Sequence, residues 1–549
     1  MVALWSASAA WGEGTAGSQD ASSGPALSRA PTDPNALSRP DRLDARPPDH
    51  RLTGDQAQAI AATSRKVQAA LRKHPTARPE VFLKGPSRWQ VSWFTPGTGD
   101  ARKEIAQVYV DDGLGAITEA WTGPQVAWTM ARGYPGAFGR KVNSPWVWIP
   151  LAALFVAPFV SLRRRPQILL LDLLVLVGFS VSVAFFNDAN LDASVPIIAP
   201  LLAYVLARMA WIGYRRARSP AADAEPLRLA VPTLWLAIAL VFLVGFRIGL
   251  NLTSSNVIDV GYSGVIGADR LVDGQKIYGH FPADNEHGDT YGPFAYEAYV
   301  PFEQALPWSG RWDDLPAAHG AAIAFDLLTL GFLILLGRRI RGPGLGIVLG
   351  YLWVSWPFSL YALNCNTNDG LVAALAALTL LVASRPVARG ATAALAGLSK
   401  LGALALVPLL ATHGAPRGRP GRTIVLFGAG FILAAVLAFI PIAAHGEAVR
   451  TIYDRTIGFQ IGREAPFSLW GLYDLTAPQR VWQVGAVLFA LAAAVLPRRR
   501  DVVGLAAVAA AVVIALQLGL TYWFYLYLLW FFPFAIVALV ARYRVPDPA

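Results

Sequence analysis

Long apolar runs fill the chain from about residue 145 onward, and they restrict the possible folds more than any other feature. Most of these runs approach the ~20 residues that an α-helix needs to cross a bilayer, and short arginine-bearing segments separate them. Only 15% of the residues are charged, against about 25% in soluble domains. The sequence therefore predicts an all-α polytopic membrane protein with about 11–13 transmembrane helices.

Hydropathy places the candidate crossings near 146–162, 167–186, 195–213, 228–250, 318–337, 343–361, 369–384, 423–443, 481–497, 501–518 and 521–541. The segment 387–412 is too short for two full crossings, although arginines stand on both sides of it. We expect two short helices that meet at Ser399 and Lys400 and place the lysine at the outer membrane face. The alternative is a single crossing with a snorkelling lysine.

The arginines indicate how the chain is oriented. Clusters such as Arg163–Arg165 and Arg498–Arg500 alternate with the short loops 187–194 and 362–368, which contain no lysine or arginine. Basic loops favour the cytoplasm, so we expect the N-terminal region outside the cell membrane and the C-terminus inside. This topogenic role explains the net charge of +11 better than nucleic-acid binding does. Cys365, the only cysteine, excludes an intramolecular disulfide.

The polar region before residue 146 predicts a separate extracytoplasmic part. Residues 1–53 are expected to be a signal remnant and a disordered linker. Residues 54–125 predict a small α+β domain, with a helix over 54–74, strands over 89–93, 105–110 and 116–121, and a turn at Asp111-Asp-Gly113. The stretch VYVDDGLGAITEAW resembles the strand–turn–strand of PepSY-type domains, which implies binding or regulation.

The membrane region divides into three accessory helices, 146–213, and a core, 228–542, with two long outer loops, 251–317 and 445–480. Asp259 follows an outward crossing by a few residues, where a carboxylate can act as a general base towards an acceptor hydroxyl. The alternative for such an aspartate is a helix cap or a solvated loop residue.

Several motifs follow Asp259 in a recognisable order. They are Asp-x-x-Tyr at 259–262, Asp-Gly-x-x-Ile-Tyr at 273–278, Tyr-x-Pro-x-x-Tyr at 291–296, an Asn-rich stretch at 364–368 and Gly-Leu-Ser-Lys at 397–400. This order resembles the GT-C fold glycosyltransferases, with family 87 as the nearest pattern. The resemblance implies a GT-C-like core that moves mannose, another hexose or arabinofuranose from a polyprenyl-phosphate-linked donor to an extracytoplasmic glycan or glycolipid acceptor. It also implies that the protein needs no cofactor and that membrane lipids surround it.

The resemblance also implies roles for particular residues. Asp259 would be the catalytic base, and cations would stabilise the departing lipid phosphate: Lys400 first, then Arg455, Arg463 and Arg247, the last with snorkelling as its alternative. The predicted substrate-binding residues are Tyr262, Asp269, Tyr291, Tyr296, Glu297, Asn364, Asn366 and Asn368. No Asp-x-Asp pair stands at Asp259, so no metal is implied, although His287 and Asp289 form a polar insertion able to bind a metal or an acceptor.

Other readings remain open at this point. The polar residues within crossings, Asp172, Asp326 and Gln517, are candidates for function, whereas the aromatic run 522–527 is interpreted as an interfacial belt. A lipid transporter or flippase is one alternative to the enzyme, although no internal repeat supports it. A non-catalytic sensor that uses the PepSY-like domain is another.

Overall fold

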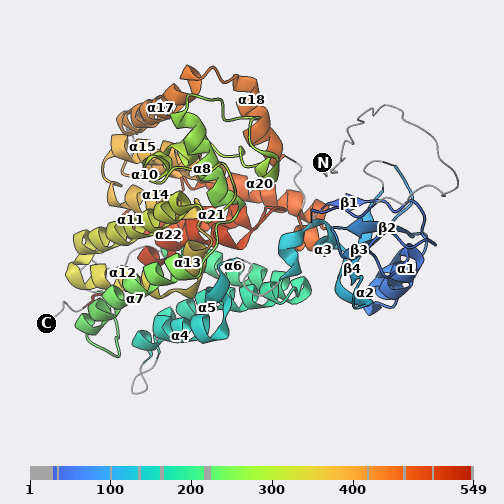
Figure 1. Ribbon diagram of the computed structural model, residues 1–549. Helices are drawn as coiled ribbons and strands as arrows, with labels where there is room; N and C mark the ends of the chain where they lie inside the picture. Colours follow the sequence, from blue (N-terminus) through green and yellow to red (C-terminus); the bar gives the residue numbers. More distant parts are fainter. Residues whose placement is uncertain are drawn as a thin grey trace, which may run out of the picture. The chain divides into compact units, whose positions relative to one another are not determined.

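The computed structural model describes residues 29–33, 36–98, 102–133, 138–160, 166–214, 224–416, 420–461, 465–496 and 500–545. The chain divides into two compact units, Met1–Gly133 and Tyr134–Ala549. The first unit contains a β-sheet with short helices, and the second is built of helices (Figure 1).

The N-terminal unit is an antiparallel sheet covered on one face by two helices. Its five strands follow the order β1-β2-β3-β4-β5, with β1 (Leu37–Ser38), β2 (Arg78–Lys84), β3 (Arg88–Phe94), β4 (Glu104–Asp111) and β5 (Ala116–Thr122). Alternate strand residues such as Leu83, Trp89 and Val108 point to one face and pack against Ala57 and Val67 of the helices α1 (Gly54–Ala62) and α2 (Arg65–Lys73). This shared core holds the unit together.

Three of the strands agree with the sequence prediction, and three features differ from it, one of them the short strand β1 within the segment 1–53 expected to be a linker. The single helix expected over 54–74 is wrong, because the chain breaks into α1 and α2 at Thr63 and Ser64. Strand β2 was not among the predicted strands, and it contains Pro79, a residue type that is unfavourable in a strand interior. The proline stands at the second residue of β2, opposite Trp93, and the strand is built by the alternation of Val81 and Leu83 after it.

Asp112, at the end of β4, ties the sheet to the segment before α1. Its carboxylate accepts hydrogen bonds from the Trp89 indole (2.9 Å) and from the backbone N–H groups of Arg51 (2.6 Å) and Leu52 (3.0 Å). Burial raises the pKa of Asp112, but these hydrogen bonds together hold it below its ordinary value of 3.8. The stabilisation is therefore present above pH 3.8 and is lost as the pH falls through the lower pKa of the folded state.

The second unit is a bundle whose helices match the predicted crossings. Every predicted crossing overlaps one of α4 (Pro145–Val156), α5 (Ile168–Asn187), α6 (Leu191–Tyr214), α7 (Thr233–Thr253), α11 (Pro316–Arg341), α12 (Pro343–Ser355) with α13 (Pro357–Asn364), α14 (Asp369–Leu381), α17 (Gly421–Ala444), α20 (Thr476–Ala492), α21 (Val502–Gln517) and α22 (Leu528–Val540). Between them lie α8 (Asp259–Val272), α9 (Pro293–Glu297), α10 (Val300–Ala305), α15 (Pro386–Ser399), α16 (Val407–Thr412), α18 (Val449–Tyr453) and α19 (Leu469–Leu472).

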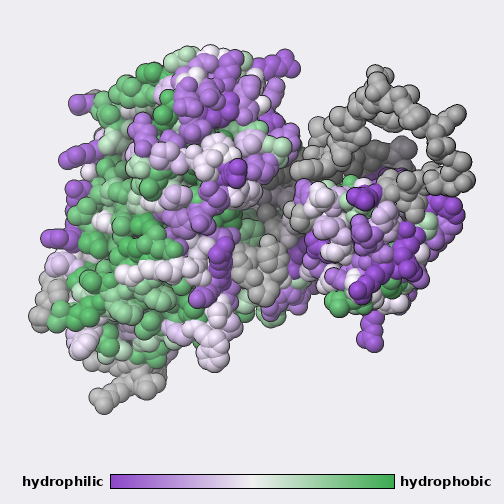
Figure 2. Space-filling model, in the orientation of Figure 1, coloured by the Kyte–Doolittle hydropathy of each residue, from purple (hydrophilic) through white to green (hydrophobic). Residues whose placement is uncertain are grey.

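Length and hydropathy identify the bundle as a multi-pass membrane protein. Within the described residues, five helices are long and apolar enough to cross a bilayer, and α12 with α13 forms a sixth candidate that bends by 58°. Figure 2 shows hydrophobic residues gathered over this unit. Large apolar side chains such as Phe242 on α7 and Leu433 on α17 are 70% and 59% exposed, as expected where lipid replaces a protein partner.

The expected break at Ser399 and Lys400 is present in the chain. Helix α15 ends at Ser399, and the chain returns along it through a 3₁₀ segment, Leu401–Leu406, and α16. Helix α15 packs tightly against α17 because glycines meet backbone there: a Cβ at Gly390 or at Gly430 would lie 2.0 Å from a backbone oxygen of the other helix. The lysine at the tip is buried, so the snorkelling alternative is wrong.

Removal of the Asp112 carboxylate tests the link between sheet and N-terminal segment. Asp112→Ala leaves one buried and two part-buried donors unpaired, and we expect it to destabilise this unit by roughly 2–4 kcal/mol. Hydrogen exchange of peptides from α1 and β3 in the full-length protein measures the effect. Asp55→Ala, at an exposed aspartate in the first turn of α1, is the control and should cost less than about 1 kcal/mol. Equal exchange in the two variants would contradict the assignment.

Candidate active site

The catalytic candidate Asp259 stands at the first residue of α8, held in place by the loop between α13 and α14. Ahead of it, the backbone N–H groups of Asn256 and Ile258 donate to the carbonyl oxygens of Asn364 (3.2 Å) and Cys365 (3.3 Å). A Cβ at Gly261 would lie 2.0 Å from the carbonyl oxygen of Asn366. Only glycine permits this approach, so the first turn of α8 rests directly on the Asn-rich loop.

The three asparagines of that loop differ in what they bind. The side-chain amide of Asn366 donates to the Ser255 hydroxyl and to the Asn256 carbonyl, both at 3.0 Å, and its backbone has a φ of +50°. Asn364 donates to a backbone oxygen, whereas its own side-chain oxygen has no partner among the described residues. Neither amide atom of Asn368 has a partner in this part of the chain, although the residue is buried. Asn366 is therefore structural, and Asn368 retains its hydrogen-bonding capacity.

Lys400 lies at the α15 tip between a carboxylate and an aromatic face. Its ammonium nitrogen is 3.7 Å from Asp369 Oδ1 and 4.1 Å from the centre of the Tyr291 ring. The Trp530 indole donates to the same Asp369 oxygen at 2.8 Å. Lysine and aspartate are both buried, so desolvation strengthens the attraction between them and the cation–π contact.

Close backbone contact brings Tyr291 to the tip. A Cβ on Gly292 would lie 2.2 Å from the carbonyl oxygen of Leu398, two residues before the lysine. The first long loop can therefore lie flat against α15 only because residue 292 is glycine. The tyrosine of the Tyr-Gly-Pro motif is thus held at the lysine by the glycine that follows it.

Tyr291 also connects this cluster to Asp259. Burial raises the pKa of the Tyr291 phenol well above its ordinary value, and the negative charges of Asp259 and Asp369 raise it further, with the hydroxyls of Tyr527 and Tyr522 nearby. Of the predicted residues, Lys400 and Tyr291 are in direct contact, and Asp259 is near enough for its charge to act on the Tyr291 phenol.

Some members of this cluster were missed from the sequence. Asp369 directly follows the Asn-rich stretch, but no partner cation could be named without the fold. The interpretation of 522–527 as only an interfacial belt is wrong: Tyr525 is buried, and Tyr527 stacks on Trp530 with ring centres 4.3 Å apart. The close approach of Gly402 to the Trp530 ring joins the start of α22 to the tip.

Arg455 joins the two long loops. Its guanidinium is 2.7 Å from an oxygen of Asp289, and it also donates to the Glu286 carbonyl. Asp289 is fully buried and accepts from the Gly279 backbone N–H (2.6 Å). The insertion that contains Asp289 therefore anchors an arginine. Arg463, the other predicted cation of the second loop, lies outside the described residues.

Arg247 lies in the bundle interior, where its guanidinium N–H groups donate hydrogen bonds to other protein groups. Its guanidinium forms a two-pronged ion pair with Asp326 of α11 (2.5 and 3.3 Å) and donates to the Ser359 hydroxyl and the Val354 carbonyl. Both charged side chains are buried. This geometry does not fit the alternative of a snorkelling Arg247, and it does not leave Asp326 as a free carboxylate within the membrane. It also gives no support to a contact of Arg247 with a donor phosphate.

The other predicted substrate residues lie away from the tip or within the packing of the first loop. The Tyr262 hydroxyl donates to Asp284 (3.4 Å), and the Tyr296 hydroxyl donates to the Gly288 carbonyl (2.9 Å). Both tyrosines are buried. Asp269 follows Asp259 by ten residues on α8, which separates the two by about 15 Å along the helix axis. These three residues shape the loop.

Glu297, at the end of α9, forms no ion pair with any residue that the structure describes. Burial raises its pKa from 4.5 to about 7, and its Oε1 has no hydrogen-bond partner within the described ranges. A carboxyl group in this state is close to half protonated at neutral pH. Glu297 is therefore a pH-sensitive group beside the loop that carries Tyr291.

Comparisons with known proteins add little to what the geometry shows about this chain. No family model and no curated protein matches the chain. Among solved structures, it is similar to the crystal structure of ArnT from Cupriavidus metallidurans bound to undecaprenyl phosphate. The TM-score is 0.42 and the sequence identity 17%, over 57% of this chain and 60% of that one. The chain thus spans less than two thirds of the length of that protein.

Breaking the Arg247 pair tests its structural role. Asp326→Ala leaves a buried guanidinium without its counter-ion, and we expect it to destabilise the bundle by about 3–5 kcal/mol. In the double variant Arg247→Leu with Asp326→Leu, most of that stability should return. Thermal unfolding in detergent measures both, and a double variant as unstable as the single one would contradict this role.

The raised pKa of Glu297 predicts a pH dependence of stability. A carboxyl whose pKa is higher in the folded state stabilises the fold fully below 4.5, and this contribution is lost as the pH rises through about 7. We expect the Tm of the wild type to fall between about pH 5 and pH 8 by more than the Tm of Glu297→Gln. Glu286→Gln, at an exposed glutamate of the same loop, should keep the wild-type slope; equal slopes in all three proteins would rule out this titration.

Proposed function

We propose that the chain is a GT-C type membrane glycosyltransferase that moves a sugar from a polyprenyl-phosphate-linked donor to an acceptor hydroxyl. The observation that supports this most directly is the contact of Lys400 with the Tyr291 ring, together with the effect of the Asp259 charge on the phenol of that tyrosine. A transferase of this kind needs a base for the acceptor and a cation for the lipid phosphate. The arginine distribution favours an extracytoplasmic location for this site.

Asp259 would accept the proton of the acceptor hydroxyl as its oxygen attacks the anomeric carbon of the donor sugar. The bond between that carbon and the phosphate oxygen then breaks, and the lipid phosphate leaves with the electron pair. Lys400 would neutralise the charge that develops on the phosphate, and its burial increases the effect. The protonated phenol of Tyr291 can donate a hydrogen bond to the same oxygen.

Asp369 and Trp530 would hold the lysine ready for the phosphate. The aspartate orients the ammonium group before the donor binds, and the Trp530 hydrogen bond fixes that aspartate. Asn368, beside it, has both amide atoms available for sugar hydroxyls. Arg455 and Arg463 stay candidates for binding the donor phosphate, although Asp289 partly neutralises the Arg455 guanidinium. Arg247 is not proposed for this role.

The finer assignments are proposals of the same kind. Mannose, another hexose or arabinofuranose fits the proposed donor, and a glycan or glycolipid fits the proposed acceptor. Family 87 is the nearest sequence pattern. The N-terminal sheet unit, with its PepSY-like strands, would bind the acceptor or a partner protein.

Transfer of labelled sugar from a polyprenyl-phosphate donor in membranes tests the proposal. Asp259→Asn should lower the rate by roughly 10²–10⁴-fold because a general base is removed, and Lys400→Met by about 10²–10³-fold because a stabilising cation is lost. Asp273→Asn, at an exposed aspartate that follows α8, is the control and should keep the wild-type rate. Wild-type transfer by Asp259→Asn would overturn the proposed role of that carboxylate.

A further inference from the structure

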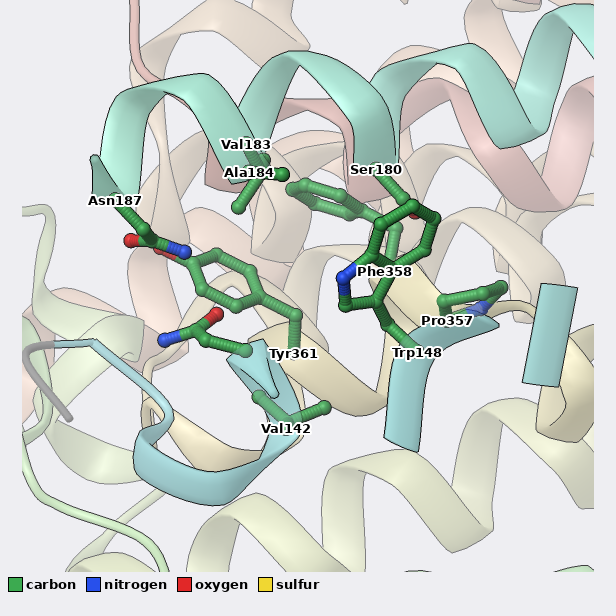
Figure 3. Close-up of a pocket in the computed structure, with 10 residues that line it drawn as sticks. Val142, Trp148, Ser180, Val183, Ala184, Asn187, Pro357, Phe358 and Tyr361 are labelled. Atoms are coloured by element: carbon green, nitrogen blue, oxygen red, sulfur yellow. The ribbon is translucent and has the colours of Figure 1, made fainter. Parts of the chain in front are cut away.

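A polar cavity of about 510 Å³ lies at the end of the bundle where α5 begins. Three separate stretches of the chain line it: the start of α5, the segment 225–228 before α7, and the residues that follow α22. Its volume is within the range of small-molecule sites. By contrast, the hollow between α5 and α13 (Figure 3) measures about 20 Å³ and has room for about one water molecule. The larger cavity is therefore the one that can hold a ligand.

Hydrogen bonds fix the walls of this cavity to one another. The side-chain amide of Gln167 donates to the Glu225 carboxylate (2.8 Å), and its oxygen accepts from the backbone N–H of Arg228 (3.0 Å). The backbone N–H of Leu227 donates to the Arg544 carbonyl (2.8 Å), and that of Arg544 donates to the Glu225 carbonyl (3.0 Å). The start of α5, the segment 225–228 and the end of the chain therefore form one connected wall.

This wall carries one positive charge in excess. Arg228 pairs with Glu225 at 3.3 Å, so these two charges balance each other. Arg542 also lines the cavity, and it forms no ion pair with any residue that the structure describes. Its guanidinium donates to the Leu539 carbonyl (3.2 Å) and to the Tyr543 hydroxyl (2.5 Å), which are both uncharged. The charge of Arg542 therefore favours an anion in the cavity.

A further arginine stands close to this wall. Arg208 of α6 is buried and pairs with Asp172 of α5 at 2.9 Å, but its Nη2 has no hydrogen-bond partner among the described residues. Burial raises the pKa of the Tyr543 phenol above its ordinary value, and the charges of Arg542, Glu225 and Arg208 also act on that phenol. Arg208 is therefore near enough to add to the positive potential of the cavity.

The start of α5 acts in the same direction. Gln167 is the N-cap of this 20-residue helix, and its side chain makes no hydrogen bond to the first turn, since it holds the segment 225–228 instead. The N-terminus of a helix carries a partial positive charge. With one unpaired guanidinium beside it, the cavity fits a group of single negative charge with several acceptor oxygens, which is the description of a phosphodiester.

Exposed apolar side chains lead away from the cavity along α5. Ile168 lines the cavity and is 49% exposed, and Leu171 and Leu174 follow at intervals of three residues with 49% and 50% exposure. Residues at this spacing are neighbours on a helix surface, and exposed apolar side chains of a spanning helix face acyl chains. A water-soluble phosphate would make no use of this stripe, so a lipid is favoured as the source of the phosphodiester.

The cavity is remote from the Lys400 cluster. Helix α22 carries Trp530 at that cluster and ends at Val540, about 15 Å further along its axis, and Arg542 follows this end. The arginine distribution predicts that this end of the bundle faces the cytoplasm, where basic sites between membrane helices bind anionic lipids. The site is therefore separate from the proposed sugar transfer.

We propose that this cavity binds the phosphodiester head group of an anionic phospholipid, of the chemical class of a phosphatidylglycerol, from the surrounding leaflet. The phosphate would lie between Arg542 and the start of α5, and one acyl chain would run over Ile168 and Leu171. The lipid would thereby bridge α5 and the end of the chain. This inference goes beyond the proposed transfer reaction and does not rest on it.

Photolabelling of the full-length protein in lipid nanodiscs tests the site. The probe is a phosphatidylglycerol with a diazirine in one acyl chain, and the comparison is a phosphatidylcholine with the same chains. We expect saturable labelling of the peptide that carries Ile168 and Leu171, and at least about tenfold weaker labelling by the phosphatidylcholine, whose ammonium group would stand beside Arg542. Equal labelling by both lipids would overturn the anionic assignment. Loss of labelling in excess inorganic phosphate would overturn the lipid as the source of the phosphate.

Variants at one position locate the binding. Arg542→Gln removes the unpaired charge and should lower the labelling by phosphatidylglycerol about tenfold, whereas Arg542→Lys keeps the charge and should lose less. Arg422→Gln, at an exposed arginine in the first turn of α17, makes the same change in net charge and should not lower the labelling. Wild-type labelling in Arg542→Gln, or an equal loss in Arg422→Gln, would overturn the proposal, whatever the sugar-transfer assay shows.

Discussion

The buried ion pair between Lys400 and Asp369 is the interaction on which the arrangement around the proposed site depends. A lone ammonium group buried in this interior would lose its proton, or its side chain would turn outward to water. With a carboxylate at 3.7 Å and an aromatic face at 4.1 Å, it can stay charged and ordered without water. The pair also forces the α15 tip, the start of α14 and the Tyr291 loop to meet. The first turn of α22 joins them through Trp530.

Glycine provides the close contacts that this meeting requires. Gly261 lets α8 rest on the Asn-rich loop, and Gly292 lets the first long loop reach the backbone before Lys400. Gly390 and Gly430 let α15 and α17 approach until their backbones touch. A Cβ at Gly261 would push α8 off the Asn-rich loop, and a Cβ at Gly292 would push the Tyr291 loop off α15. The precision of the site therefore comes from absent side chains as much as from charged ones.

Much of the membrane fold could be predicted from the sequence because each crossing is a local signal. Apolar run length and arginine clusters mark α5 or α17 without knowledge of their neighbours. Pairings across the bundle leave no such signal. Arg247 and Asp326 are 79 residues apart, so no local pattern in the sequence indicates that they neutralise each other. Asp369 was missed for the same reason. The aromatic run at 522–527 was misinterpreted because aromatic residues at a membrane interface and in a binding site have the same composition. In the N-terminal unit, β2 was not predicted, and it contains Pro79.

A site with two acidic groups and one cation carries an excess of negative charge, which a donor phosphate would increase. The charges of Asp259 and Asp369 both act on the Tyr291 phenol, and before substrate arrives Lys400 is held by Asp369. A donor phosphate would bring one more negative charge to the same lysine. The ion pair with Asp369 would then loosen as phosphate binds. Arg455 of the second long loop is already held in an ion pair by Asp289, so its positive charge is partly balanced before the donor arrives.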